Sequence, residues 1–99
     1  MKRPTRPELR VKIWSPTQTY YHGLAMSVSA RNQVGPFDIL SGHANFFTML
    51  EEGHIVVNDG YQNFSFPITK GIMKVTNNEA TLFVDIEPAY GEANTPKTQ

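Results

Sequence analysis

Six titratable side chains are the candidates for chemistry in this sequence of 99 residues: His22, His43, His54, Asp38, Asp59 and Asp85. A metal site needs several such ligands gathered around one point, and a catalytic metal also keeps a position open for water. The histidines stand singly instead, 21 and 11 residues apart and each beside a glycine. The sequence therefore predicts turn or surface histidines, with no metal and no other cofactor.

One stretch, GPFDILSGHANFF at residues 35–47, could bring an acid and a base together as Asp38 and His43. Ser41 precedes His43 by two residues, but an activated serine needs a sharply turned, exposed setting, and no such pattern surrounds it. Asp and Ser also commonly bond local backbone donors in turns. Two interpretations stay open at this point. The stretch is either a small hydrolytic site or a shaped surface that another protein binds.

Length and composition describe one small domain. The absence of cysteine excludes disulfides and thiolate metal sites, and no apolar run approaches the ~20 residues of a membrane span. No signal-peptide core follows the basic start, so we expect a mature cytosolic chain. Residues 1–12 hold five basic side chains and one acidic one, although the whole chain has no net charge. We expect a flexible basic tail over 1–8, one domain over 9–86 and a disordered polar tail over 87–99.

Alternating polar and apolar residues dominate the domain and predict eight or nine short strands without a helix. Leu9, Val11 and Ile13 mark the buried face of the first strand. A second strand is predicted to follow, with a bend near Gly23 and one face formed by Leu24, Met26, Val28 and Ala30. The pattern then predicts a loop at 31–36, strands at 37–40 and 45–50, and a hairpin turn at 58–60. Pro67 is expected at an edge or terminal position of its strand, and a closing hairpin is predicted over 71–86.

The aromatic residues allow a second kind of function. Rings on a small barrel could stack the bases of a single-stranded nucleic acid. From residue 13 onward, however, four basic side chains face eight acidic ones, which disfavours a polyanion. We therefore predict that these rings mainly fill a sandwich core: Tyr20, Tyr21, Phe46, Phe47, Tyr61, Phe64 and Phe66.

Three segments, in order, resemble the epsilon subunit of rotary ATP synthases, which is called delta in mitochondria. FDILSGHANFFTML is similar to the family's G-x-L-P-G-H-A-P-L-x-T-x-L. LRVKIWSPTQTYYHGLAMSVSA resembles its opening strand and its F-x-G-x-V-x-S-V-x-A segment, and FPITKGIMKVTNNEATLFVD resembles its S-G-G-F-L-E-V segment and the strand after it. The resemblance covers residues 9–86 and implies an all-β sandwich of two antiparallel sheets.

The resemblance also implies a role. Family members are non-catalytic central-stalk subunits of a proton-translocating ATP synthase, at the cytoplasmic face of the bacterial inner membrane. They bind the gamma subunit and the ring of c subunits, and they couple ring rotation to ATP synthesis without entering the membrane or binding nucleic acid. Carried over by position, the gamma-facing residues are Ser15, His43 and Thr48, and the c-ring-facing residues are Arg31, Pro36, Phe37 and Asp38. Trp14 and Phe37 would serve as exposed apolar anchors.

The chain departs from the family pattern at several positions. Pro36 stands where an acid is usual, Asp38 stands where glycine is usual, and the usual double glycine is Lys70-Gly71. Most members continue into two helices that can inhibit hydrolysis and sometimes bind ATP. This chain has a polar tail there, so neither property is expected of it. The alternative function is a free-standing sandwich that binds another protein or a nucleic acid.

Overall fold

The computed structural model describes residues 6–86, and every regular element in this range is a strand. The eight strands are β1 (Leu9–Trp14), β2 (Thr19–Ala25), β3 (Ser27–Asn32), β4 (Gly35–Leu40), β5 (Phe46–Leu50), β6 (Gly53–Asn58), β7 (Asn63–Thr76) and β8 (Glu79–Ile86). The described range holds no helix that could span a membrane. The predicted all-β class is confirmed. Residues 1–5 and 87–99, where the tails are predicted, lie outside the described residues.

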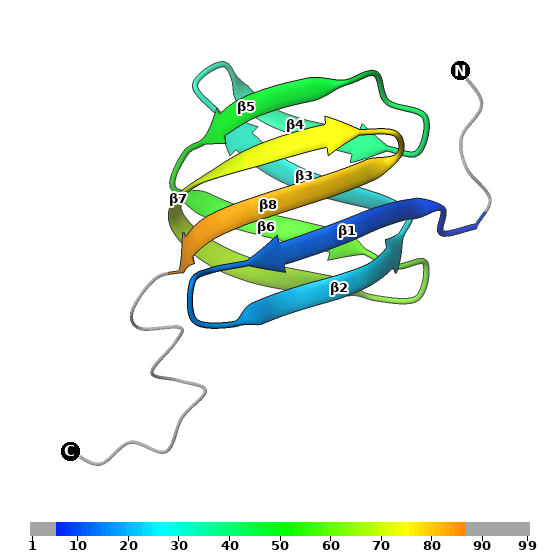
Figure 1. Ribbon diagram of the computed structural model, residues 1–99, viewed down its shortest axis with the longest axis horizontal. Coiled ribbons are helices and arrows are strands. Elements are labelled where there is room, and N and C mark those ends of the chain that lie inside the picture. The colour runs from blue at the N-terminus through cyan, green and yellow to red at the C-terminus, as the bar shows by residue number, and fades with distance from the viewer. Residues whose placement is uncertain (1–5, 87–99) are drawn as a thin grey trace, which may run out of the picture.

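The strands form two layers (Figure 1). The front sheet has the order β2-β1-β8-β7-β5, where β7 contributes residues 70–76. The back sheet has the order β4-β3-β6-β7, where β7 contributes residues 63–68. The predicted sandwich is therefore confirmed. Neighbouring strands run antiparallel except β1 and β8, which pair in parallel.

The chain passes between the two sheets at two places that the sequence pattern only partly reveals. One is inside β7, where the register shifts between Ile68 and Lys70. The other is a bend at Met26, between β2 and β3. Because of this bend, Ala25 and Val28 are buried while Leu24 is exposed. The prediction of one strand with Leu24, Met26, Val28 and Ala30 on a single face is wrong, and so is the bend at Gly23, which lies within β2.

The predicted loop at 31–36 is also wrong, because β3 and β4 form a tight hairpin there. Only Gln33 and Val34 lie between Asn32 and Gly35, which pair with each other. The Asn32 side chain explains the tight turn, since its Oδ1 accepts hydrogen bonds from the backbone N–H of Val34 at 2.9 Å and of Gly35 at 3.3 Å. An Asn side chain that bonds the backbone two residues ahead is a common turn former.

Two further predictions are confirmed, the hairpin turn at 58–60 and the edge position of Pro67. Asp59 forms the β6–β7 turn by accepting 2.8 Å hydrogen bonds from the backbone N–H of Tyr61 and of Gln62. These bonds favour the charged carboxylate and hold the pKa of Asp59 below its ordinary value. Pro67 pairs with His54 of β6 only, so it lies at the back-sheet edge, where a missing N–H costs no ladder bond.

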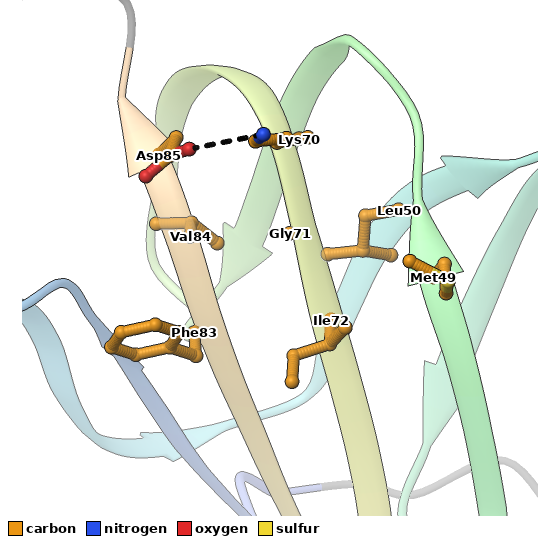
Figure 2. Close-up of a pocket in the computed structure, with 8 residues that line it drawn as sticks. All are labelled: Met49, Leu50, Lys70, Gly71, Ile72, Phe83, Val84 and Asp85. Carbon is orange, nitrogen blue, oxygen red and sulfur yellow. Dashed lines mark ion pairs between the residues drawn. The ribbon is translucent and has the colours of Figure 1, made fainter.

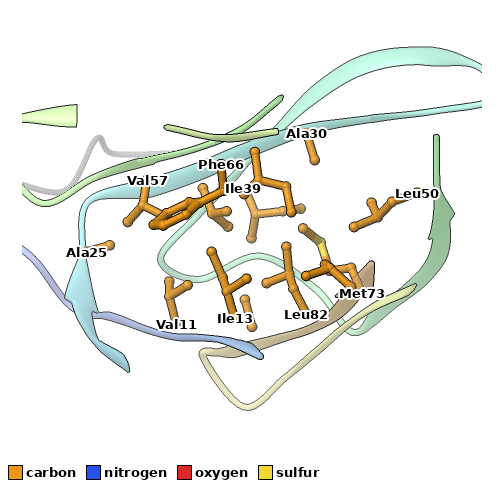
Figure 3. Close-up of a cluster of buried hydrophobic side chains, with 14 of the residues drawn as sticks. Val11, Ile13, Ala25, Ala30, Ile39, Leu50, Val57, Phe66, Met73 and Leu82 are labelled. Carbon is orange, nitrogen blue, oxygen red and sulfur yellow. The ribbon is translucent and has the colours of Figure 1, made fainter. Parts of the chain in front are cut away.

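The core lies between the two sheets, and Figure 3 shows its side chains meeting from both layers. The predicted buried face of β1 is confirmed, because each of its three side chains is at most 1% exposed: Leu9, Val11 and Ile13. Five of the seven aromatic residues predicted to fill the core are buried or half-buried and packed in the core or against it: Tyr20, Tyr21, Phe46, Phe64 and Phe66. Phe47 and Tyr61 are exposed, so the core prediction is wrong for these two.

We expect Gly71→Ala to lower the free energy of unfolding by about 1–3 kcal/mol, because there is no room for a side chain at this position. A Cβ at residue 71 would lie 2.8 Å from the Phe83 carbonyl oxygen and 2.9 Å from Cγ1 of Val84. At Gly23 the nearest atom is a Tyr21 ring carbon at 3.8 Å, so Gly23→Ala is the matched control. Urea unfolding of both variants makes the comparison, and equal stabilities would contradict the close β7–β8 packing.

Candidate protein interface

A row of apolar side chains crosses the outer face of the front sheet. Trp14 of β1 lies beside Phe83 of β8, Phe83 beside Ile72 of β7, and Ile72 beside Met49 of β5. Phe47 lies two residues before Met49 on β5 and points outward like it. The exposed fraction is 65% for Phe47, 67% for Met49 and 38% for Ile72. We call these five residues the apolar face. Contiguous exposed apolar surface of this kind typically marks an interaction site.

Trp14 anchors one end of the apolar face. Its ring lies edge-on to Phe83, with ring centroids 4.6 Å apart, and the Lys12 ammonium lies 5.1 Å from the ring centroid. The indole N–H is buried and has no hydrogen-bond acceptor among residues 6–86. Trp14 is therefore half-buried against the sheet, and the expectation of a freely exposed anchor is wrong for this ring.

A groove of about 300 Å³ lies along the same face, and Figure 2 shows Met49, Ile72 and Phe83 on three neighbouring strands around it. Gly71 lies in its floor, because a side chain there would collide with β8. Lys70 and Asp85 lie at one end with 4.0 Å between Nζ and Oδ2. Both are more than half exposed, so this ion pair adds little stability. The groove is mainly apolar and holds no group of reactive side chains.

The outer face of the back sheet is different. The corresponding row there runs Asp38, Ser29, Val56, Ser65 across four strands. Its polar groups bond one another: Ser29 Oγ donates to Asp38 Oδ1 at 2.6 Å, and His54 Nδ1 lies 2.9 Å from Ser65 Oγ. This face is suited to water, so the front sheet carries the better candidate interface.

The predicted c-ring residues lie together on the β3–β4 hairpin. Arg31 pairs with Pro36, and both are exposed, as is Asp38. Phe37 is half-buried, because its ring packs on Phe46 with centroids 5.6 Å apart. Val34, at the tip of this hairpin, is 96% exposed.

The Asp38–His43 pair is not formed. Asp38 is bonded to Ser29, whereas His43 lies beyond the end of β4 in the 41–45 loop. There the His43 Nδ1 donates to the Ala44 carbonyl at 2.7 Å, and its ring packs on Phe46 at 5.4 Å. Ser41 Oγ donates to Glu8 at 3.4 Å rather than approaching the imidazole. A hydrolytic site on these residues therefore has no geometry to support it.

The predicted gamma-facing residues lie at three places. Ser15 is only 8% exposed, and its hydroxyl lies 3.2 Å from Thr17 Oγ1 and 3.3 Å from the Tyr20 hydroxyl. Thr48 of β5 is half-buried and accepts a 3.1 Å hydrogen bond from Asn32 Nδ2. His43 is half-buried in its loop. In sequence, Ser15 follows Trp14 and Thr48 lies between Phe47 and Met49. The Thr48 side chain points to the opposite side of β5 from those two residues, toward Asn32 of β3.

Within the described residues, no three His, Asp or Glu side chains gather in a way that could hold a metal ion. Met49, Ile72 and Phe83 are the residues of the candidate interface that the sequence did not single out. Each alternates with buried neighbours on its own strand, which is the pattern of a residue that faces outward. The available signal was a large apolar residue at an outward position on three strands of one sheet.

Comparison with known proteins agrees with this architecture. Residues 8–87 match the family described as ATP synthase, Delta/Epsilon chain, beta-sandwich domain. The chain is 34% identical over 77 residues to the ATP synthase epsilon chain of Cyanothece sp., covering 78% of this chain and 56% of that one. It is 31% identical over 81 residues to that of Francisella tularensis subsp. holarctica, with 82% and 56% covered. The chain thus spans just over half the length of these relatives.

Two solved structures have the same fold. A chain from the central stalk and c-ring of the Tetrahymena thermophila mitochondrial ATP synthase superposes with a TM-score of 0.71 at 13% identity, covering 96% of this chain and 78% of that one. A chain of the Euglena gracilis mitochondrial ATP synthase superposes with a TM-score of 0.72 at 14% identity, covering 95% and 71%. By its sequence match over residues 8–87 and its fold, this chain belongs to the beta-sandwich domain family of ATP synthase delta/epsilon chains.

Proposed function

We propose that this chain is a central-stalk subunit of a rotary, proton-translocating ATP synthase. It binds the gamma subunit and the c-ring, so that ring rotation is coupled to ATP synthesis, and it performs no catalysis itself. Its place is at the cytoplasmic face of the bacterial inner membrane, as a peripheral part of the complex. The observation that carries the proposal is the apolar face, which gives a sandwich of this family a ready surface for a protein partner.

We assign gamma to the apolar face. Ser15 and Thr48, which align with gamma-facing positions, are the chain neighbours of Trp14 and of Phe47 and Met49, although the Thr48 side chain points to the other side of β5. Because the Ser15 hydroxyl is buried in the β1–β2 turn, it acts by shaping that turn and not by direct contact. Phe47, Met49 and Ile72 are left to bury apolar area against gamma.

We assign the c-ring to the β3–β4 hairpin. Arg31, Pro36 and Asp38 are exposed on it, and Val34 forms an apolar tip. Phe37 supports the hairpin from beneath through its contact with Phe46. A hairpin held by the Asn32 side chain keeps one shape when a ring turns against it, since its backbone bonds are already made.

Co-expression with the gamma subunit encoded in the same genome tests the proposal. We expect a stoichiometric complex that survives purification and gives the mass of one copy of each chain in native mass spectrometry. The isolated chain should neither hydrolyse nor synthesise ATP. Absence of a complex at micromolar concentrations of both chains would overturn the proposal and favour a sandwich with another partner.

A further inference from the structure

We propose that Asn78 is a positioning residue for the partner-facing loop 41–45, and that it fixes His43 relative to the apolar face. The inference rests on the proposed function for its binding consequence, but its structural part concerns the chain alone. Asn78 lies in the β7–β8 turn, 36 residues from Gly42 and 70 residues from Glu8 in sequence. In Figure 1 this turn lies beside the connection from β4 to β5, at the end where β1 begins.

The side chain of Asn78 uses both of its polar atoms to join these segments. Its Oδ1 accepts a 2.7 Å hydrogen bond from the Gly42 backbone N–H. Its Nδ2 donates to the Glu8 carbonyl at 3.0 Å. Its own carbonyl accepts from the Arg10 N–H, also at 3.0 Å. One residue therefore links the loop to the start of the strand that carries Trp14.

The loop has few other restraints. The His43 backbone N–H donates to the Leu40 carbonyl at 3.1 Å, a local bond that does not fix the loop to the rest of the sandwich. The Ser41–Glu8 bond is long, at 3.4 Å, and exposed. Gly42 has a φ of +87°, a left-handed conformation that glycine adopts without steric cost, and no atom other than those of its chain neighbours lies within 4 Å of where a Cβ would be, so no side chain holds the backbone there. The His43 ring also packs on Phe46, with ring centroids 5.4 Å apart, but the bond from Gly42 to Asn78 is the short hydrogen bond that ties the loop backbone to a distant part of the chain.

The turn explains why asparagine can take this role. Asn77 and Asn78 have φ values of 51° and 63°, in the left-handed region that Asn tolerates better than most residues. That backbone conformation closes the hairpin between β7 and β8. Asn77 is exposed and makes no side-chain hydrogen bond within residues 6–86, whereas Asn78 is half-buried and forms a hydrogen bond through each of its two polar side-chain atoms. The two neighbours share a backbone role, and only Asn78 positions the loop.

The test compares Asn78→Gly with Asn77→Gly. Glycine keeps the left-handed backbone in both variants, so the hairpin still closes, and only the first variant loses the two side-chain bonds. Amide hydrogen exchange on the full chain alone should show the Gly42 N–H exchanging about tenfold faster in Asn78→Gly and unchanged in Asn77→Gly. Asn78→Asp, which keeps the acceptor for Gly42, should restore slow exchange.

Affinity for gamma is the second readout. We expect the dissociation constant to rise about tenfold in Asn78→Gly, with Asn77→Gly and Asn78→Asp close to the parent chain. Unchanged Gly42 exchange in Asn78→Gly would overturn the positioning role itself. Faster exchange with unchanged affinity would overturn its link to binding. Failure of the parent chain to bind gamma is a separate result, which would overturn the proposed function.

Discussion

Replacing Leu82 with alanine should lower the free energy of unfolding by about 2–5 kcal/mol, the cost of deleting a fully buried leucine side chain and leaving a cavity. Leu82 has no exposed surface and lies on β8, the strand that joins β1 to β7 in the front sheet. In Figure 3 its side chain lies among those of Ile13 and Met73. A domain of this size has a total stability of about 5–15 kcal/mol, so the loss is a large part of it.

Urea unfolding followed by tryptophan fluorescence measures this effect, since Trp14 is next to β8. Thr81→Ala is the control, because Thr81 is the preceding residue on the same strand and points to the outer face. We expect Thr81→Ala to change stability by less than about 1 kcal/mol. A loss below half a kcal/mol for Leu82→Ala would mean that β8 presents its other side to the core.

The sequence was sufficient for local features, and the reason is the period of two. Alternation at Leu9, Val11 and Ile13 identified β1 and its buried face, because successive side chains on a strand point to opposite sides. Turn chemistry identified the hairpin at Asp59, where a short acidic side chain caps two backbone N–H groups. Both features depend on residues close together in the chain.

Features set by distant residues were missed. Alternation alone does not reveal where the chain leaves one sheet and joins the other. Because the chain bends at Met26, Leu24 is exposed and Ala25 is buried, which is the opposite of what continuous alternation with the buried Val28 predicts. The parallel pairing of β1 with β8 joins residues about seventy positions apart, and no local pattern reports it. The apolar face depends on that pairing, because Trp14 meets Phe83 only when the two strands are neighbours.

In the candidate site, too, some residues could be predicted from the sequence and others could not. Position within the family pattern picked out Arg31, Pro36 and Asp38, which the structure gathers on the β3–β4 hairpin, and their contact with the c-ring stays a prediction. The predicted Asp38–His43 pair is not formed because Asp38 lies within β4, bonded to Ser29, whereas His43 lies beyond the end of this strand. Strand geometry places them apart, since each strand residue advances the chain by about 3.3 Å.

Replacing Ile72 with aspartate should weaken binding to gamma by about 100-fold or more while the sandwich stays folded. Ile72 is at the centre of the apolar face, between Phe83 and Met49. A carboxylate buried there without a partner loses its hydration and gains no compensating bond, a cost of about 3–5 kcal/mol in protein interiors. Because Ile72 is 38% exposed in the isolated chain, the same change should cost folding only about 1 kcal/mol or less.

Ser65→Asp supplies the matched control, since it adds the same charge to the outer face of the other sheet and can still accept a hydrogen bond from His54. Dissociation constants for gamma, measured by titration calorimetry on both variants, should separate the two faces. Loss of affinity in Ile72→Asp alone would place gamma on the front sheet. Equal losses would reflect net charge, because a long-range field does not distinguish the faces and weakens with added salt. Loss only in Ser65→Asp would move the partner to the back sheet, and the apolar face would then need a different occupant.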